Sequence, residues 1–221
     1  MTDKPKRVAY LLVRHGEAEG NREYRFIGQM DVPLSELGRC QADLVSQRLG
    51  STGVTRILSS DLQRASATME PLAATGIPML TDVRLREIDN GQWAGLLPEE
   101  IEHRWPDMWE RYRTGEDVAR PDGERWADVQ ARAIAAIESD LERADDGDIV
   151  AVASHGGPTV ALIMWALGLP LGGSIFRGPI APIHNASIST VLMPSRRIGG
   201  LNDVGHLGAL VSEAKVRFLE R

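Results

Sequence analysis

The 221-residue sequence has a single cysteine and no apolar run long enough to cross a bilayer. Because Cys40 has no second cysteine to pair with, an internal disulfide is excluded, and such cysteine usage is typical of a reducing compartment. The longest apolar stretch, residues 159–171, is too short for a transmembrane helix and is interrupted by Gly168 and Pro170. Residues 1–6 lead directly into the first expected strand and show no signal peptide. We therefore expect a soluble, cytoplasmic protein without a membrane partner.

Basic charge is also scarce, and lysine is especially so. The chain carries 25 basic and 31 acidic residues, a net charge of -6, whereas a sequence-independent nucleic-acid binder needs a basic face. Only Lys4, Lys6 and Lys215 are lysines, so every cation between them is an arginine, whose planar guanidinium suits phosphate and carboxylate. The sequence has neither a cysteine pair nor a His-x-x-x-His pattern, both common sources of metal ligands. We expect no nucleic-acid partner, no metal and no cofactor, and the sequence leaves a homo-oligomer open.

Short apolar runs alternate with helical patterns along the chain. The runs that indicate strands lie at residues 8–13, 55–60, 79–85, 148–153 and 186–193. Between the first four of them, apolar residues recur at the spacing of an amphipathic helix. This alternation predicts an α/β protein, a three-layer α/β/α sandwich with a mostly parallel central sheet. With 43% hydrophobic residues and no interdomain linker, the chain is expected to form one domain over residues 1–221.

Residues 96–122 differ from the rest and indicate a cap-like insertion over the sheet. Pro98 suits the first turn of a helix. The aromatic side chains of Trp105, Trp109 and Tyr112 would either pack a small separate core or line the mouth of a substrate site. The second alternative would use the neighbouring arginines as well, namely Arg104, Arg111 and Arg113.

Three local features carry specific expectations. Ser35 is expected to cap a helix whose buried side includes Cys40. Asp61 is expected to cap the helix after the second strand. Farther along, the Gly-Gly pair at residues 199–200 indicates a turn, after which residues 204–207 would return as an edge strand.

Charged or imidazole side chains follow four of the expected strands, close to the point where each strand ends. In strand order they are Arg14 and His15, then Arg64, then Glu87, then His155. Ligands of open α/β sheets bind beyond the carboxyl ends of the strands, so we expect these side chains to converge. Taken singly, Arg64 could instead pair with Asp61 at the surface, and Glu87 could be a solvated charge.

Two imidazoles, two guanidiniums and a carboxylate suit phosphoryl transfer through a histidine. A neutral imidazole can attack phosphorus in line, and Arg14 and Arg64 would stabilise the charge on the equatorial oxygens. A protonated His155 would add a donor. A carboxylic acid such as Glu87 can protonate the leaving alkoxide and then act as base for incoming water. Gly156 bares a backbone amide at a helix start, which is a natural anion site.

The motifs that carry these residues resemble those of the histidine phosphatase superfamily, also called phosphoglycerate mutase-like. They are Leu12-Val13-Arg14-His15-Gly16-Glu17 with Asn21, and residues 34–38, 59–65, 85–95, 154–157 and 202–207. The resemblance implies that His15 is the phosphorylated nucleophile and that Glu87 is the proton donor, without a metal. It also implies a phosphate pocket and a set of substrate contacts. The pocket residues would be Arg14, Arg64 and His155, and the substrate contacts Asn21, Gly28, Gln29 and Gly156.

The superfamily contains phosphatases and mutases, and three departures favour a phosphatase. Pro98 stands where mutases carry a lysine, residues 88–91 stand in place of Arg-His-Tyr-Gly, and Gly157 replaces an asparagine. Each departure weakens the hold on a second anionic group. We therefore expect a metal-independent phosphomonoester hydrolase that forms a phosphohistidine and acts on a small phosphorylated metabolite. The alternatives are a cofactor-dependent phosphoglycerate mutase and an inactive relative that binds phosphorylated ligands or another protein.

Overall fold

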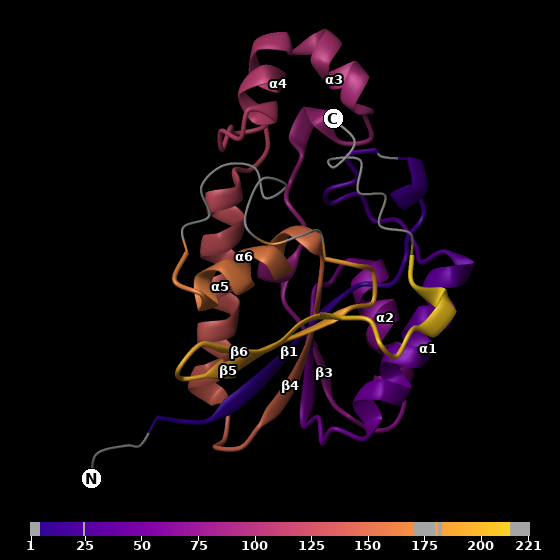
Figure 1. Cartoon of the computed structure of the whole chain (residues 1–221), viewed down its shortest axis with the longest axis vertical. Coiled ribbons are helices and arrows are strands. Elements are labelled where there is room, and N and C mark those ends of the chain that lie inside the picture. Colours follow the sequence, from indigo (N-terminus) through magenta and orange to yellow (C-terminus); the bar gives the residue numbers. More distant parts are fainter. Residues whose placement is uncertain (1–4, 24, 170–179, 181–182, 213–221) are drawn as a thin grey trace.

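The computed structural model describes residues 5–23, 25–169, 180 and 183–212, and it has a six-stranded sheet at its centre (Figure 1). The strand order is β3-β2-β4-β1-β5-β6. The strands are β1 (Val8–Arg14), β2 (Arg56–Ser59), β3 (Met79–Thr81), β4 (Ile149–Ser154), β5 (Ile188–Met193) and β6 (Arg197–Asp203). The first four run parallel to one another, β5 is antiparallel to β1, and β6 is antiparallel to β5. The expected mostly parallel sheet is confirmed.

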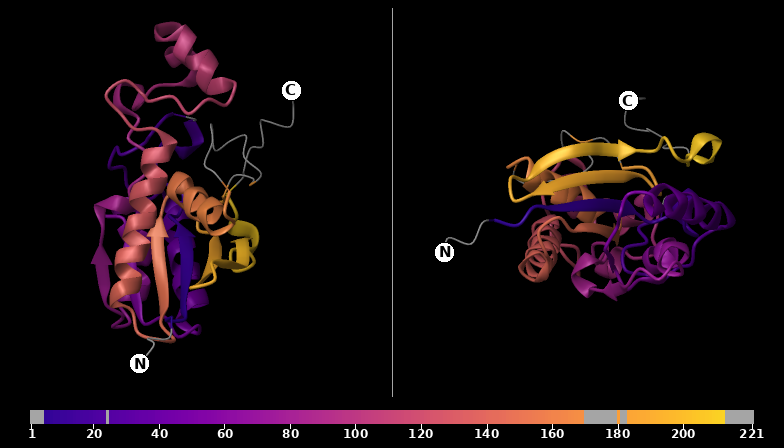
Figure 2. Two further views of the ribbon diagram at one scale, coloured as in Figure 1. Left: turned by 90° about the vertical axis from the view of Figure 1, so that its left-hand side faces the viewer. Right: turned by 90° about the horizontal axis from the view of Figure 1, so that it is seen from below.

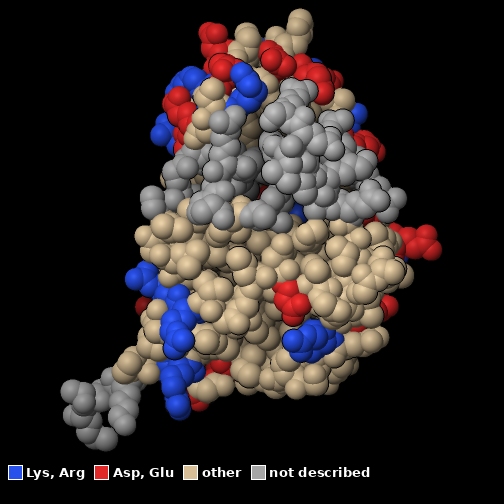
Figure 3. Space-filling view, in the orientation of Figure 1, with Lys and Arg blue, Asp and Glu red and all other residues tan. Residues whose placement is uncertain are grey.

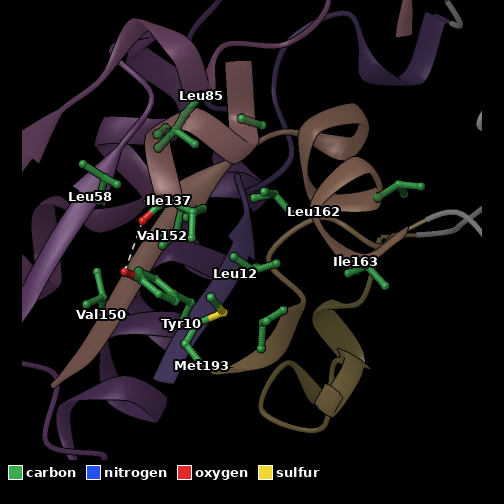
Figure 4. Packing of buried hydrophobic residues seen from close by; sticks show 14 of the residues in the cluster. Tyr10, Leu12, Leu58, Leu85, Ile137, Val150, Val152, Leu162, Ile163 and Met193 are labelled. Atoms are coloured by element: carbon green, nitrogen blue, oxygen red, sulfur yellow. Dashed lines mark hydrogen bonds between the residues drawn. The ribbon is translucent and has the colours of Figure 1, made fainter. Parts of the chain in front are cut away.

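Helices cover both faces of the sheet, which confirms the three-layer sandwich. The long helices are α1 (Glu36–Gly50), α2 (Gln63–Ala73), α5 (Trp126–Arg143) and α6 (Gly156–Ala166). Successive side chains of a strand point to opposite faces. Val150 and Val152 accordingly pack in the core beneath α5 and α6, whereas Ala151 and Ala153 pack against α1 and α2. Figure 4 shows the first of these cores, where the Tyr10 hydroxyl donates a 3.4 Å hydrogen bond to Ile137 O on α5.

The segment expected as an insertion forms two short helices, α3 (Pro98–Arg104) and α4 (Pro106–Arg113), at one end of the molecule (Figures 1 and 2). They enclose a small apolar core of their own, made of Trp93, Ile101, Tyr112 and Val118. The aromatic side chains therefore pack into a small separate core, which was the first of the two alternatives for this segment. On the face drawn in Figure 3, acidic and basic side chains intermix over these helices. Arg113 and Glu110 of α4 form an exposed ion pair (2.6 Å).

Helix α1 begins as expected but presents a different side to the core. Gly38 N donates to the Ser35 hydroxyl (3.1 Å), so the N-cap is confirmed. Cys40, however, is exposed, and the expectation that it is buried is wrong. The physical reason is the close approach at Gly38, where a Cβ would overlap Glu17 O and lie 2.9 Å from the carbonyl carbon of Glu17. This contact turns Gly38, rather than Cys40, toward the buried loop that follows β1.

The predicted cap of helix α2 is also wrong. Helix α2 begins at Gln63, whose N–H donates to Asp31 Oδ1 (2.8 Å). Asp61 instead accepts from Arg86 Nε (2.7 Å). Both partners come from distant parts of the chain, which is why local sequence reasoning selected the nearest carboxylate.

Two expected strand boundaries need correction. Strand β3 ends at Thr81, and residues 83–85 form a 3-10 turn, η2 (Val83–Leu85), capped by Asp82. The Gly-Gly pair at residues 199–200 lies inside β6, and the turn falls at residues 194–196 instead. A glycine suits this position in the strand because the Thr190 side chain of β5 lies close to it: a Cβ at Gly199 would be 3.2 Å from Thr190 Cγ2. Residues 204–207 form no strand but lead into the 3-10 turn η5 (Gly208–Leu210).

Across the described residues, none of the helices combines the length and apolar character needed to cross a bilayer.

Candidate active site

The two histidines lie side by side because their strands are neighbours. Strands β1 and β4 pair in parallel with Arg14 opposite Ser154, and His15 N donates to Ser154 O (2.9 Å). His15 and His155 therefore leave the sheet together. Their ring centroids are 5.0 Å apart at an interplanar angle of 61°. Both side chains are buried.

The hydrogen bond of His15 determines which ring nitrogen is free. Its Nδ1 lies 2.6 Å from Gly16 O, and a carbonyl oxygen only accepts, so Nδ1 must carry the proton. The lone pair of the neutral ring is then on Nε2. The backbone that carries the ring is held by Asn185, whose Nδ2 donates to His15 O (3.1 Å), and by Thr68, whose Oγ1 accepts from Gly16 N (2.9 Å).

His155 is oriented by a serine. Ser60 Oγ lies 2.9 Å from His155 Nε2 and accepts a 3.3 Å hydrogen bond from Leu62 N. The Ser60 hydroxyl proton can then be donated to Nε2, which leaves the imidazole proton on Nδ1. Within the described part of the chain, that buried Nδ1 has no hydrogen-bond partner, and neither has Arg14 Nε. Two buried donors without acceptors at one site suit the oxygens of an anion.

Burial and two nearby arginines favour the neutral form of both imidazoles. Arg64 is almost fully buried in the first turn of α2, and its guanidinium donates to Gly28 O and Met30 O, both at 2.7 Å. The surface pair of Arg64 with Asp61 is therefore wrong. Arg14 donates from Nη1 to Ile183 O. Burial, followed by the charges of Arg64 and Arg14, holds the pKa of His15 well below its ordinary value.

The pKa of His155 is lowered well below the ordinary value for similar reasons. Burial is the largest cause, followed by the charge of Arg64 and the interaction with His15. A neutral imidazole is the form of His15 that can act as a nucleophile. A bound phosphate would counter the arginine charges and favour protonation of His155.

Glu87 reaches the site through the start of helix α6. Its Oε2 accepts from Gly157 N (3.2 Å) and its Oε1 accepts from Ile88 N (2.9 Å). The Glu87 carboxylate is close enough to Arg14 and Arg64 to influence the pKa of both guanidiniums. The interpretation of Glu87 as an isolated solvated charge is wrong.

The four residues expected to contact the substrate have different surroundings in the structure. Gly156 lies beside the Arg14 guanidinium, since a Cβ there would be 3.7 Å from Arg14 Cζ. The carbonyl of Gly28 is taken up by Arg64, as described above. Gln29 Nε2 donates to Glu87 O (3.1 Å), so this amide holds the backbone at Glu87. Asn21 Oδ1 accepts from Ala18 N (3.0 Å) and from Asn185 Nδ2 (3.4 Å), the amide that also donates to His15 O.

Sequence reasoning missed the residues that orient the others. Ser60 belongs to the motif at residues 59–65 but has no predicted role, and its only signal is its position directly after β2. Asn185, Thr68 and Arg132, which donates from Nη2 to Glu87 O (2.9 Å), are far in sequence from the backbone groups that they hold, and no local pattern marks them. Among the residues that the structure describes, no group of three or more His, Cys, Asp or Glu side chains could hold a metal ion.

Comparisons with known proteins find close relatives. The family model of the histidine phosphatase superfamily (branch 1) matches residues 10–199. The probable phosphoglycerate mutase GpmB of Yersinia pestis is 40% identical over 167 residues, 72% of this chain and 74% of that protein. Among solved structures, Bacillus stearothermophilus YhfR has a TM-score of 0.82 at 30% identity, covering 90% of this chain and 99% of its own.

A mycobacterial glucosyl-3-phosphoglycerate phosphatase is also similar. It has a TM-score of 0.76 at 31% identity, over 89% of this chain and 98% of its own. One structure of that phosphatase is a complex with inorganic phosphate.

Proposed function

This chain belongs to the histidine phosphatase superfamily, branch 1, and from that premise we propose that it is a phosphomonoester hydrolase that works through a phosphohistidine on His15. The observation that carries the proposal is the geometry of the buried His15 ring, whose Nδ1 is bonded to Gly16 O and whose centroid lies 5.0 Å from that of the His155 ring. The guanidiniums of Arg14 and Arg64 add the positive charge that a phosphoryl group needs. We expect the substrate to be a small phosphorylated metabolite, and the reaction to need no metal.

In the first step, His15 Nε2 attacks the phosphorus of the monoester. The N–P bond forms as the P–O bond to the substrate breaks, and Glu87, protonated at that moment, gives its proton to the leaving alkoxide. In the second step, the Glu87 carboxylate takes a proton from water while the water oxygen attacks phosphorus. The N–P bond breaks, inorganic phosphate leaves, and His15 and Glu87 return to their starting states.

Gly157 supports a hydrolase over a mutase. A Cβ at this position would overlap both Glu87 Oε1 and the ring atom Cζ3 of Trp126. The asparagine expected there in mutases would therefore displace the acid or the indole. In this chain the carboxylate of Glu87 occupies that space and bonds to the Gly157 amide (3.2 Å).

Acid and alkali quenching of a reaction with a 32P-labelled phosphomonoester tests the proposal. A phosphohistidine is stable to alkali and labile to acid, so we expect an alkali-stable label on the wild type and on His103→Asn, a change at an exposed residue of α3. His15→Asn should carry no label. Failure to trap such a label on the wild type would overturn the phosphohistidine. Turnover that survives a chelator is expected, and its loss would contradict metal independence.

A mutase is the second candidate, and the name of the 40% identical GpmB relative favours it. The two activities separate on a single substrate. Given 3-phosphoglycerate, a hydrolase releases inorganic phosphate, whereas a mutase forms the 2-isomer. We expect release of phosphate to exceed isomer formation, and the opposite ratio would assign the chain to the mutases.

A further inference from the structure

The segment that carries Glu87 lacks regular secondary structure. Residues 86–90 lie between η2 and the next 3-10 turn, η3 (Gly91–Trp93), and belong to no strand or helix. Buried backbone groups outside a ladder or helix need partners from elsewhere. Here several of these partners come from one arginine and one glutamate that are distant from this segment in sequence.

The guanidinium of Arg132, on α5, donates to three backbone carbonyls, two within this segment and one in η2 just before it. Its Nη1 donates to Arg84 O (2.7 Å) and Arg86 O (2.5 Å), and its Nη2 donates to Glu87 O (2.9 Å). A guanidinium has five N–H donors in a fixed plane, whereas a lysine ammonium has three donors at one point. Lysine could therefore not hold the same three carbonyls and the partner described next.

Glu124 completes the arrangement. It accepts from Arg132 in bidentate fashion, with Nε to Oε1 at 2.8 Å and Nη2 to Oε2 at 2.9 Å. The Glu124 Oε2 atom also accepts from Asp89 N (2.8 Å), and Glu124 N donates to Asp89 O (2.9 Å). The chain is thus held on both sides of Glu87, and the pair itself is largely shielded from water, with exposed fractions of 17% for Arg132 and 23% for Glu124.

We infer that Arg132 is a positioning residue for the proton transfer: it holds the backbone at Glu87 so that the carboxylate stays at the start of α6. The inference rests on the proposed function, because Arg132 would position Glu87, the proposed proton donor. The carboxylate is aimed by Gly157 N (3.2 Å) and Ile88 N (2.9 Å), and both bonds depend on where the Glu87 backbone lies. The shift of a carboxyl by about 1 Å can cost about 100-fold in rate.

The experiment compares two substrates with different needs for the acid. A p-nitrophenolate ion leaves without a proton, whereas an alkoxide needs one. For Arg132→Met we expect kcat/KM on an alkyl phosphate such as 3-phosphoglycerate to fall at least about tenfold more than kcat/KM on p-nitrophenyl phosphate. Arg132→Lys, which keeps the charge, should recover only a part of this difference. Equal losses on the two substrates would overturn the inference.

A double variant tests whether Arg132 acts through Glu87. Glu87→Gln should show the same selective loss on the alkyl phosphate. Adding Arg132→Met to Glu87→Gln should then leave the ratio between the two substrates unchanged, because the acid is already gone. A further selective loss in the double variant would mean that Arg132 acts by another route.

Arg84→Met is the matched control. Arg84 also links this region to α5, by donating to Ala135 O (3.1 Å) and Ser139 Oγ (3.0 Å), but its side chain does not bond to residues 86–89. It should lower stability in a similar way without changing the ratio between the substrates. If Arg84→Met changes the ratio as much as Arg132→Met does, weaker attachment of α5 alone would explain the selective loss on the alkyl phosphate. That result would overturn the inference.

Hydrogen exchange gives a measurement that is independent of turnover. The amides of Ile88 and Gly157 donate to the Glu87 carboxylate, and Asp89 N donates to Glu124, so all three should exchange faster in Arg132→Met and not in Arg84→Met. Unchanged exchange would overturn the positioning role. If the wild type hydrolyses neither substrate, the proposed function fails, and the exchange rates alone decide whether Arg132 holds this segment.

Discussion

Ser60 Oγ lies 2.9 Å from His155 Nε2 at the end of β2, so the orientation of the second histidine depends on a buried hydroxyl. We predict that Ser60→Ala lowers kcat/KM for p-nitrophenyl phosphate by between about five-fold and a hundred-fold. This range corresponds to the ~1–3 kcal/mol lost when a buried polar group has no partner. Ser66→Ala is the control: it removes a hydroxyl that donates to Gln63 O within helix α2, and it should change the rate little.

Vanadate affinity shows whether the pocket itself has changed. If Ser60 orients His155 toward the phosphoryl group, Ser60→Ala should weaken inhibition by vanadate along with turnover. Wild-type turnover and inhibition in Ser60→Ala would show that the His155 ring is held by its packing alone.

Gly157 is expected to tolerate no side chain. A Cβ there would overlap Glu87 Oε1, so Gly157→Ala should move the carboxylate from its place at the start of α6. We predict a loss of at least about tenfold on alkyl phosphates, with a smaller loss on p-nitrophenyl phosphate, since only the alkoxide needs the acid. Steady-state kinetics on both substrates checks this.

Gly50→Ala is the control for that substitution. Gly50 ends α1, and a Cβ there would meet no atom within 4 Å in the described structure. Its kinetics should match the wild type. Equal activity of Gly157→Ala and wild type on alkyl phosphates would contradict the place given to Glu87.

The two histidines should make stability depend on pH below about 6.5, the ordinary pKa of histidine. In the unfolded chain both imidazoles take up protons as the pH falls through this value, whereas in the folded chain burial and the charges of Arg64 and Arg14 keep them neutral. The unfolded state then binds more protons. The free energy of unfolding should therefore decrease as the pH falls, by up to about 1.4 kcal/mol per pH unit for each histidine.

Urea unfolding between pH 5 and 7.5 measures this slope. His155→Asn removes one of the two protons and should make the slope shallower. His103→Asn, at an exposed position on α3, should leave it unchanged. Identical slopes for wild type and His155→Asn would show that His155 binds protons equally in the folded and unfolded chains, so that folding does not lower its pKa.

The layers of the fold could be predicted from the sequence because each strand and helix carries a local pattern. The alternation that sends Val150 and Val152 to one face and Ala151 and Ala153 to the other is a property of any strand. The errors lie where the deciding partner is remote. Asp31 caps α2 in place of Asp61. On α1, the contact of Gly38 with Glu17 leaves the Cys40 side chain exposed.

The candidate site divides in the same way. His15, Arg14, Arg64, Glu87 and His155 could be selected because each follows a strand, and parallel strands end at the same edge of the sheet. The residues that orient them could not. Ser60 and Arg132 act through contacts that exist only after folding, and polar residues of their kind occur throughout the surface of any protein.

The last prediction concerns the helices α3 and α4 and the expectation that residues 96–122 form an insertion within one domain. Trp93 is fully buried at the centre of their small core, with its ring 5.4 Å from Tyr112 and 5.8 Å from Phe26. Truncation of a buried tryptophan to alanine costs about 3–5 kcal/mol. Because this core is separate from those beside the sheet, we predict that Trp93→Ala opens α3 and α4 locally.

Limited proteolysis and hydrogen exchange check that prediction. In Trp93→Ala we expect cleavage within residues 96–122 and fast exchange there, with the amides of β1 and β4 still protected. Leu72→Ala, in the core between α2 and the sheet, should have the opposite pattern, with reduced protection throughout the sheet. If Trp93→Ala instead lowers protection of β1 and β4 as much as that of α3 and α4, the helices and the sheet unfold as one unit. The apolar core around Trp93 would then be part of the main fold in energetic terms, although it is separate in space.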